Sequence, residues 1–310
     1  MITDRIDAVT HIPDEYRNTV LPPPKSVKIE LTGLCNFACS FCARSQKLRK
    51  VGEINRHFYE RIVKEMHDAG VQELGLFYLG ESFMVDWLPQ AIKYAKDVGF
   101  EYVFLTTNGS LASRDKVEAC LKAGLNSLKF SFNYADAKQM KDIANVKEKY
   151  FDVIVDNIKS AWAERNLWNY KCGLYASYIE YDGDQGEKMK AAVEEIKPYV
   201  DEVYALPLYN QAGFVTQQEI AKGMKPSQGN RGRLDNMVDG LPCWALSTEG
   251  HISWNGQLTG CCFSHTPDFD FGNLNTTSFM DAWNSERAQW FRDAHLKKDI
   301  GHTPCAGCFS

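Results

Sequence analysis

The sequence predicts an α/β protein whose parallel sheet is built from six successive βα units. Apolar, strand-like runs alternate with helical segments along residues 25–208, and such alternation produces parallel sheets with right-handed crossovers. Three predicted helices also end alike, in a glycine, a short link and the next strand, with a repeat of roughly 25 to 30 residues, the size of one βα unit. Six units are too few for a complete eight-stranded barrel.

The first predicted strand follows the run Leu21-Pro22-Pro23-Pro24, because proline blocks both helix and ladder formation. The predicted strands cover residues 27–31, 74–78, 102–105, 127–132, 173–178 and 202–206. The predicted helices cover residues 55–69, 86–98, 113–124, 151–165 and 185–197. Gly70, Gly99 and Gly124 mark three helix ends, as C-capping glycines do.

Composition divides the chain into four parts. We expect an N-terminal arm over residues 1–24, a partial barrel over 25–208, a connector over 209–240 and a small second domain over 241–310. The connector is either a lid over the barrel or a plain linker. The last part is rich in cysteine, and Asn255-Gly256 within it predicts a β-hairpin.

The overall composition excludes several classes of protein. The net charge is −5 and no block of lysine or arginine stands out, so we do not expect a nucleic-acid partner. The sequence has neither a signal peptide nor a twenty-residue apolar stretch, so we expect a cytoplasmic protein without a membrane partner. Ten cysteines in a cytoplasmic chain indicate metal or redox chemistry rather than disulfides.

Three of these cysteines, Cys35, Cys39 and Cys42, lie within eight residues just after the first predicted strand. Cysteine is the usual ligand of iron–sulfur clusters, so the three thiolates can hold three corners of a [4Fe–4S] cluster. The fourth iron is then open to a small molecule. A zinc knuckle is the simpler alternative, but zinc prefers four ligands.

The pattern C-x3-C-x2-Φ-C, in which Phe41 is the aromatic residue, closely resembles the signature loop of radical S-adenosylmethionine (SAM) enzymes. The resemblance implies a partial (βα)6 TIM-like barrel as the core. It also implies that SAM chelates the open iron, and that a donor such as flavodoxin or ferredoxin supplies an electron. Cleavage of SAM then yields a 5′-deoxyadenosyl radical.

Residues at the strand ends extend the resemblance. Gly80 and Glu81 stand where the family has its Gly-Gly-Glu-Pro motif, although Leu79 and Ser82 replace the first glycine and the proline. In that motif the backbone and the acid hold the SAM amino group. The segment Thr107-Asn108-Gly109 is expected to support the strand register. Other implied SAM contacts, each with an ordinary structural alternative, are Phe41, Ser131, Asn133, Ser177 and Leu206.

The C-terminal part resembles the SPASM/Twitch extension of these enzymes. The hairpin is followed by Gly272-Asn273-Leu274, a helix with Trp283-Asn284, and a final C-x2-C. Five cysteines favour the shorter Twitch form with one auxiliary [4Fe–4S] cluster. The implied ligands are Cys243, Cys261, Cys305 and Cys308, with Cys262 as the spare or in place of Cys261. Zinc on the same four thiolates is the alternative, while Cys120 and Cys172 are expected in the core.

The favoured function is an oxidoreductase that acts on a small, sugar- or cyclitol-like molecule. The radical abstracts hydrogen from an alcohol carbon, and loss of a proton and of an electron to the auxiliary cluster leaves a ketone. The Twitch-bearing dehydrogenases of aminoglycoside biosynthesis are similar. Three alternatives stay open. The first is an epimerase in which Cys262 donates hydrogen, and the second is a non-catalytic iron–sulfur or zinc protein. The third is a peptide maturase, although residues 1–24 are too short for the leader-binding domain that such enzymes often have.

The sequence names neither the substrate nor the catalytic base. Tyr178, Tyr209, Asn210 and Gln211 are expected only to line the site.

Overall fold

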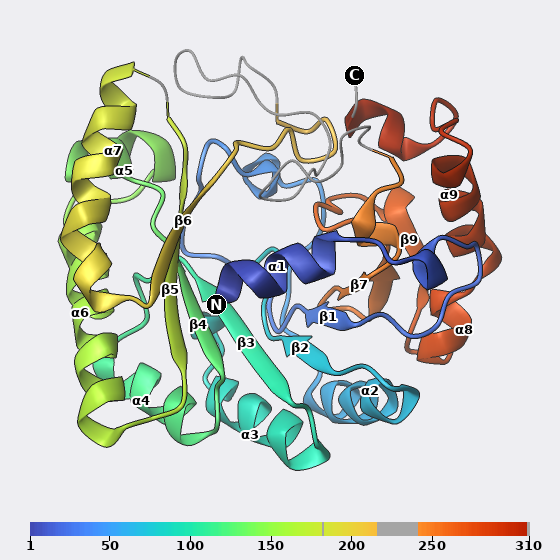
Figure 1. Ribbon diagram of the computed structural model, residues 1–310, viewed down its shortest axis with the longest axis horizontal. Helices are drawn as coiled ribbons and strands as arrows, with labels where there is room; N and C mark the ends of the chain where they lie inside the picture. The colour runs from blue at the N-terminus through green and yellow to red at the C-terminus, as the bar shows by residue number, and fades with distance from the viewer. Residues whose placement is uncertain (182, 216–240, 309–310) are drawn as a thin grey trace.

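The computed structural model describes residues 1–181, 183–215 and 241–308 (Figure 1). Most of the predicted connector, residues 216–240, lies outside this part of the chain. Within it, one sheet of nine strands has the order β6-β5-β4-β3-β2-β1-β7-β8-β9. Its strands are β1 (Ser26–Ile29), β2 (Glu73–Gly75), β3 (Tyr102–Thr107), β4 (Ser127–Ser131), β5 (Gly173–Ile179), β6 (Glu202–Leu206), β7 (Glu249–Ile252), β8 (Gln257–Thr259) and β9 (Asp270–Asn273).

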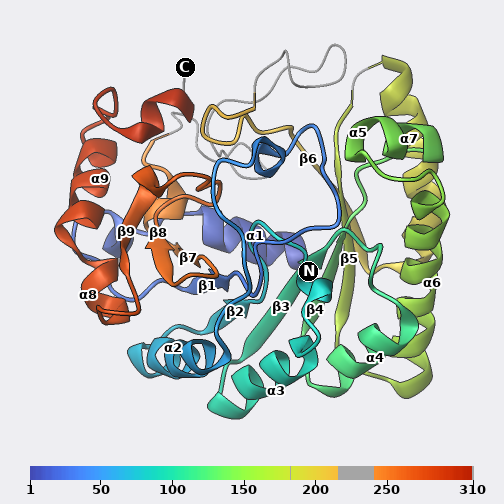
Figure 2. The same ribbon diagram turned by 180° about the vertical axis from the view of Figure 1, so that it is seen from behind.

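The strands from β6 to β7 pair in parallel, and a row of helices covers the outer face of the curved sheet (Figure 2). The helices are α1 (Ile2–Thr10), α2 (Arg56–Ala69), α3 (Leu88–Val98), α4 (Arg114–Lys122), α5 (Ala137–Ala144), α6 (Tyr150–Trp168), α7 (Gly183–Ile196), α8 (Phe279–Trp283) and α9 (Glu286–Leu296). The predicted partial barrel is confirmed.

Local signals account for the helix ends. Asn55 caps α2, because its side-chain oxygen accepts a hydrogen bond from Phe58 N at 3.0 Å. Gly70 ends the helix at φ 106°, a conformation that favours glycine. The predicted helices and strands agree with the structure to within a few residues, and Cys120 and Cys172 are buried in the core as expected.

Alternation along each strand separates the core from the barrel interior. Val27 and Ile29 of β1 and Leu128 of β4 are fully buried. Lys28, which lies between Val27 and Ile29, and Lys129, which follows Leu128, line a cavity inside the barrel. Polar side chains can therefore reach the interior without entering the hydrophobic core.

The N-terminal segment, expected as an arm, contains helix α1, which crosses the open side of the barrel between β6 and β7 (Figure 1). At its start, Glu202 of β6 accepts hydrogen bonds from Ile2 N at 3.0 Å and from the Thr3 hydroxyl group. At its end, Thr248 donates to Val9 O at 2.5 Å. The sequence analysis missed this helix because short helices gain most of their stability from packing.

The C-terminal part continues the barrel sheet rather than standing apart. Strand β7 pairs in parallel with β1, and β8 and β9 add antiparallel strands beyond it. The end of helix α8 holds the segment that precedes β1 in place. Trp283 Nε1 donates to Pro22 O at 2.9 Å. The side chain of Asn284, the residue after α8, accepts from Leu21 N and donates to Leu21 O, each at 2.9 Å. Strand β9 and helices α5 and α9 were not predicted.

Of the helices in the described ranges, none is both long and apolar enough to cross a bilayer.

Candidate active site

The three clustered cysteines lie in the loop that follows β1, at the carboxyl ends of the strands. Arg44 organises this loop from within, because its guanidinium group donates to the carbonyl oxygens of Gly33, Phe37 and Cys35, each at 3.2 Å. Gln211 holds the outer part, donating to Phe41 O at 2.7 Å and accepting from Ala43 N at 3.0 Å. The backbone is thus fixed on both sides of the cysteines.

Polar groups reach two of the sulfur atoms. The Tyr134 hydroxyl oxygen lies 2.8 Å from Cys39 Sγ, and Asn108 Nδ2 lies 3.9 Å from Cys35 Sγ. Burial raises the pKa of all three thiols, and the mutual repulsion of the thiolates raises the pKa of Cys35 and Cys39 further. Three thiolates in this place need a cationic partner, and the irons of a [4Fe–4S] cluster fit that need.

Gly80 brings the next turn against the base of this loop. A Cβ atom at this position would lie 1.9 Å from Thr32 O and 2.7 Å from Leu34 O. Glu81 N donates to Leu34 O at 2.8 Å. Glycine is therefore needed here for a close approach of two backbones.

Glu81 is 2% exposed, and its carboxylate joins the ends of β2 and β3. It accepts hydrogen bonds from Phe83 N at 3.1 Å, the Thr107 hydroxyl group at 2.8 Å and Asn108 N at 2.8 Å. Burial raises the pKa of Glu81, and these bonds oppose the rise. A carboxylate offers about four acceptor sites, so one site on Oε2 is left for an ammonium group.

The Thr107-Asn108-Gly109 segment does more than support the register. Asn108 Nδ2 donates to Asn36 Oδ1 at 3.0 Å, so it links the end of β3 to the cysteine loop. Sequence reasoning missed the roles of Arg44, Tyr134 and Asn108 at the cysteine loop. Asn108 lies inside a recognised motif, whereas Arg44 and Tyr134 carry no spacing signal.

The structure gathers the other predicted SAM contacts at the same end of the sheet. Ser131 of β4 stands opposite the buried Ser177 of β5, and Leu206 ends β6 opposite Ile179. Asn133 follows β4, where its carbonyl oxygen accepts from Tyr181 at 2.8 Å. The Phe41 ring centre lies 6.3 Å from that of Tyr134. Contact of these residues with SAM stays a prediction.

The five C-terminal cysteines come together in a second site. Burial raises the pKa of Cys243, and the nearby charges of Cys262, Cys308 and Cys305 raise it further. The adjacent Cys262 is the main cause that raises the pKa of Cys261. Five thiols surround one place, enough for a complete set of four cluster ligands.

Backbone and side-chain contacts fix these cysteines. Cys243 N donates to His295 Nδ1 at 3.1 Å, and Phe263 N donates to Cys261 Sγ at 3.3 Å. Asn210 Nδ2 donates to Cys308 O at 2.8 Å. Tyr78, at the end of the β2 region, donates its hydroxyl hydrogen to Cys261 O, which connects the second site to the barrel.

Comparison with protein families agrees with both sites. The family model for the Radical SAM superfamily matches residues 29–165. The model for the SPASM domain, described as an iron–sulfur cluster-binding domain, matches residues 243–309. The chain belongs to the radical SAM superfamily. Its radical SAM domain binds a [4Fe–4S] cluster and SAM. Its SPASM domain binds auxiliary iron–sulfur clusters.

The relatives of this radical SAM protein are named for different activities. A PqqA peptide cyclase of Xanthomonas euvesicatoria is 24% identical, over 94% of this chain and 81% of the relative. A tungsten-containing aldehyde ferredoxin oxidoreductase cofactor-modifying protein of Pyrococcus furiosus is 22% identical, over 92% and 87%. A probable GTP 3′,8-cyclase of Methanothermobacter thermautotrophicus is 26% identical, but the match covers 49% of this chain and 47% of the relative.

Solved structures share the fold. BtrN, in complex with AdoMet and 2-DOIA, has a TM-score of 0.57 and 15% identity, over 92% of this chain and 91% of BtrN. SuiB of Streptococcus suis, bound to the precursor peptide SuiA, has a TM-score of 0.66 and 16% identity, over 87% of this chain and 67% of SuiB. At these identities the likeness concerns the radical SAM fold alone.

Proposed function

We propose that this radical SAM enzyme is an oxidoreductase of a small, sugar- or cyclitol-like molecule. With its cofactors bound, the first site supplies a 5′-deoxyadenosyl radical for hydrogen abstraction and the second site accepts an electron. The observation that carries the proposal is the second set of thiols, Cys243, Cys261, Cys262, Cys305 and Cys308, which lies in the same chain and is tied to the barrel by Tyr78.

Different residues of the chain would bind the two clusters and SAM. Cys35, Cys39 and Cys42 would hold the SAM-binding cluster, and Cys243, Cys261, Cys305 and Cys308 the auxiliary cluster, with Cys262 beside it. Glu81 would use its remaining acceptor site for the SAM ammonium group. The other SAM contacts would come from Phe41, Gly80, Ser131, Asn133, Ser177 and Leu206.

The size of the barrel interior supports a small substrate. The cavity within it has a volume of about 180 Å³, close to the ~150 Å³ of an engineered cavity that binds benzene. A single small ring fills such a space.

Peptide modification is the second candidate function, supported by the likeness to a PqqA peptide cyclase and to SuiB bound to its precursor peptide. One peptide side chain would also fit the cavity. No such likeness supports an epimerase that uses Cys262. Labelling with solvent deuterium would nevertheless identify that reaction.

The test uses protein reconstituted with iron and sulfide without oxygen, then reduced and mixed with SAM. Candidate alcohols carry deuterium at the carbinol carbon, and candidate peptides run in parallel. We expect deuterium in 5′-deoxyadenosine and a ketone product. Modified peptide would favour the maturase, and solvent deuterium on a substrate carbon would favour the epimerase.

Cysteine variants separate the two sites. We expect Cys39→Ala to abolish 5′-deoxyadenosine formation, and Cys305→Ala to retain SAM cleavage while losing the ketone. Cys120→Ala is the control, because Cys120 is buried in the α4 core away from both sites. A cluster-loaded protein that never forms 5′-deoxyadenosine would refute the proposal.

A further inference from the structure

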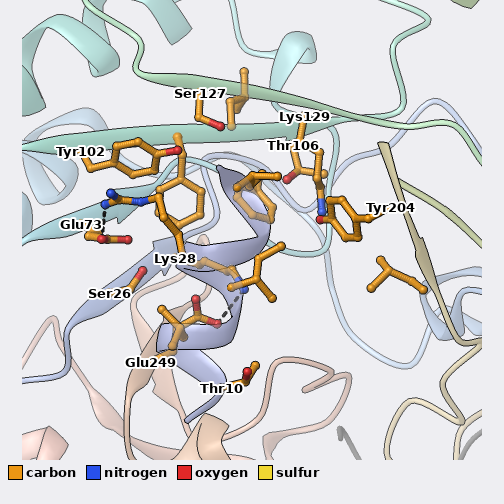
Figure 3. A pocket seen from close by; sticks show the side chains of 18 of the residues that line it. Thr10, Ser26, Lys28, Glu73, Tyr102, Thr106, Ser127, Lys129, Tyr204 and Glu249 are labelled. Atoms are coloured by element: carbon orange, nitrogen blue, oxygen red, sulfur yellow. Dashed lines mark hydrogen bonds and ion pairs between the residues drawn. The ribbon is translucent and has the colours of Figure 1, made fainter. Parts of the chain in front are cut away.

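The barrel interior contains a cavity of about 180 Å³ (Figure 3), and its lining residues Ser26, Glu73, Tyr102 and Ser127 are the first residues of β1, β2, β3 and β4. Strands β1 to β4 and β6 form one side of it, and α1 forms the other. Leu206 and Tyr209 line the cavity as well, and they belong to the carboxyl end of β6 and the segment after it. The cavity therefore extends toward the layer of residues proposed to contact SAM.

The charges that line this cavity do not balance. The lining residues include three cations, Arg5, Lys28 and Lys129, but only two acids, Glu73 and Glu249. Arg5 pairs with Glu73, and Lys28 Nζ lies 2.6 Å from Glu249 Oε2. The second pair is drawn dashed in Figure 3. One cation is left over.

That cation is Lys129, which has no hydrogen bond or ion pair with any residue in the described part of the chain. Its Nζ atom lies 5.8 Å from the centre of the Tyr204 ring. Lys129 is one of the residues that line the cavity. Burial and the charge of Lys28 lower the pKa of Lys129 to about 8, although the charge of Glu249, which is already paired with Lys28, opposes the fall. An unbalanced ammonium in a low-dielectric place strongly favours an anionic partner.

The position of Lys129 suits contact with a substrate. It lies two residues before Ser131 on β4 and therefore on the same face, about 7 Å further inside. Its neighbour in register on β3 is Thr106, which lines the cavity too. A ligand anchored at Lys129 would extend toward the strand ends, where SAM is proposed to bind.

We propose that Lys129 forms an anion-binding subsite for the substrate, which would carry a carboxylate or a phosphate group on a body of about ring size. This inference rests on the proposed function, because it assigns the cavity to the substrate of the SAM-dependent reaction. It narrows the substrate class from sugar- or cyclitol-like alcohols to those that carry an acid group.

The test measures binding by calorimetry to the reconstituted holoenzyme with SAM present. The probes are benzoate, phenyl phosphate and benzamide, which share a ring but differ in charge. We expect one or both anions to bind and neutral benzamide not to bind. The tighter anion identifies the acid group as a carboxylate or a phosphate. Lys129→Met should weaken anion binding about thirtyfold or more, as expected when one partner of a buried charge pair is lost.

Two further variants control for folding and for general charge. Lys129→Arg keeps the charge and should retain most of the affinity. Lys138→Met removes a lysine whose side chain is 83% exposed on α5 and should change nothing. Failure of both anions to bind the wild-type protein, or equal affinity for the wild type and for a Lys129→Met variant with unchanged melting temperature, would overturn the proposal.

The binding test does not depend on turnover. A holoenzyme that binds anions through Lys129 but forms no 5′-deoxyadenosine would refute the proposed function alone. An enzyme that oxidises an alcohol while its anion binding ignores Lys129 would refute the subsite alone.

Discussion

Asn210 and Gln211 are consecutive residues whose side chains bond to the two different cysteine-bearing segments. Asn210 Nδ2 donates to Cys308 O at 2.8 Å in the second site. Gln211 donates to Phe41 O at 2.7 Å and accepts from Ala43 N at 3.0 Å, on either side of Cys42. One dipeptide therefore fixes the two sites relative to each other.

Replacing Gln211 or Asn210 singly should affect one cluster at a time. Gln211→Leu removes two hydrogen bonds next to Cys42, each worth about 1 kcal/mol, and should lower occupancy of the SAM-binding cluster. Asn210→Leu should lower occupancy of the auxiliary cluster. Iron content and low-temperature electron paramagnetic resonance (EPR) spectra with and without SAM would distinguish them, and each variant serves as the control for the other. Equal losses at both clusters would contradict this division.

Gly80→Ala should disrupt the contact between the Gly-Glu turn and the cysteine loop. The added Cβ would lie 1.9 Å from Thr32 O, a backbone atom that cannot move aside. We expect a loss of stability of about 3 kcal/mol, measured as a lower melting temperature together with reduced iron content. Gly301→Ala is the matched control, since its Cβ would meet nothing within 4 Å. Similar behaviour of the two variants would exclude the predicted close contact.

Tyr134→Phe should make the reduction potential of the SAM-binding cluster more negative. The hydroxyl group lies 2.8 Å from Cys39 Sγ, and hydrogen bonds to cluster sulfur atoms stabilise the reduced state. Redox titration followed by EPR measures the shift. Tyr94→Phe is the control, because the Tyr94 hydroxyl group bonds Glu60 O in the outer helix α2 instead. An unchanged potential in Tyr134→Phe would show that this contact does not act on the cluster.

Cys261→Ala should lose the auxiliary cluster, whereas Cys262→Ala should keep it. Phe263 N donates to Cys261 Sγ at 3.3 Å, and such a bond stabilises a thiolate ligand. Iron counting and Mössbauer spectra of the two variants decide the matter. The reverse result would make Cys262 the ligand and Cys261 the spare thiol.

Asp270 should make stability depend on pH. It begins β9 in a cleft that Arg49 and Tyr78 also line, and burial raises its pKa from 3.8 to about 7. Between these values the unfolded chain loses this proton while the folded protein keeps it, so stability falls as the pH rises from about 4 to about 7.

Asp270→Asn removes this dependence. Relative to the wild type, the variant should gain about 1 to 2 kcal/mol at pH 8.5 after allowance for solvent screening, and less at pH 5.5. Melting temperatures at the two pH values measure the difference. A constant difference between variant and wild type would contradict the raised pKa.

Much of the barrel was predictable because its signals are local. Asn55, Gly70 and the alternating apolar residues of each strand specify elements without reference to distant residues. The cysteine loop was predictable for the same reason, since its ligands lie within eight residues.

The missed features depend on contacts between distant segments. Helix α1 is specified by the groove it fills and by Glu202, about 200 residues away. The roles of Tyr134 and Arg44 depend on the fold of the loop around them. The excess charge at Lys129 becomes visible only once both acids in the cavity are seen to have partners.

Strand β1 lies between β2 and β7, and its partners on the β7 side come from the far end of the chain. Lys28 of β1 and Glu249 of β7, which form an ion pair between these strands, are 221 residues apart. While the chain emerges from the ribosome, one edge of β1 stays unpaired until most of the protein has been made. Contacts of such long range slow folding, and open strand edges attract wrong partners. The pairing that joins the C-terminal part to the barrel therefore leaves one edge of β1 open to wrong partners during synthesis.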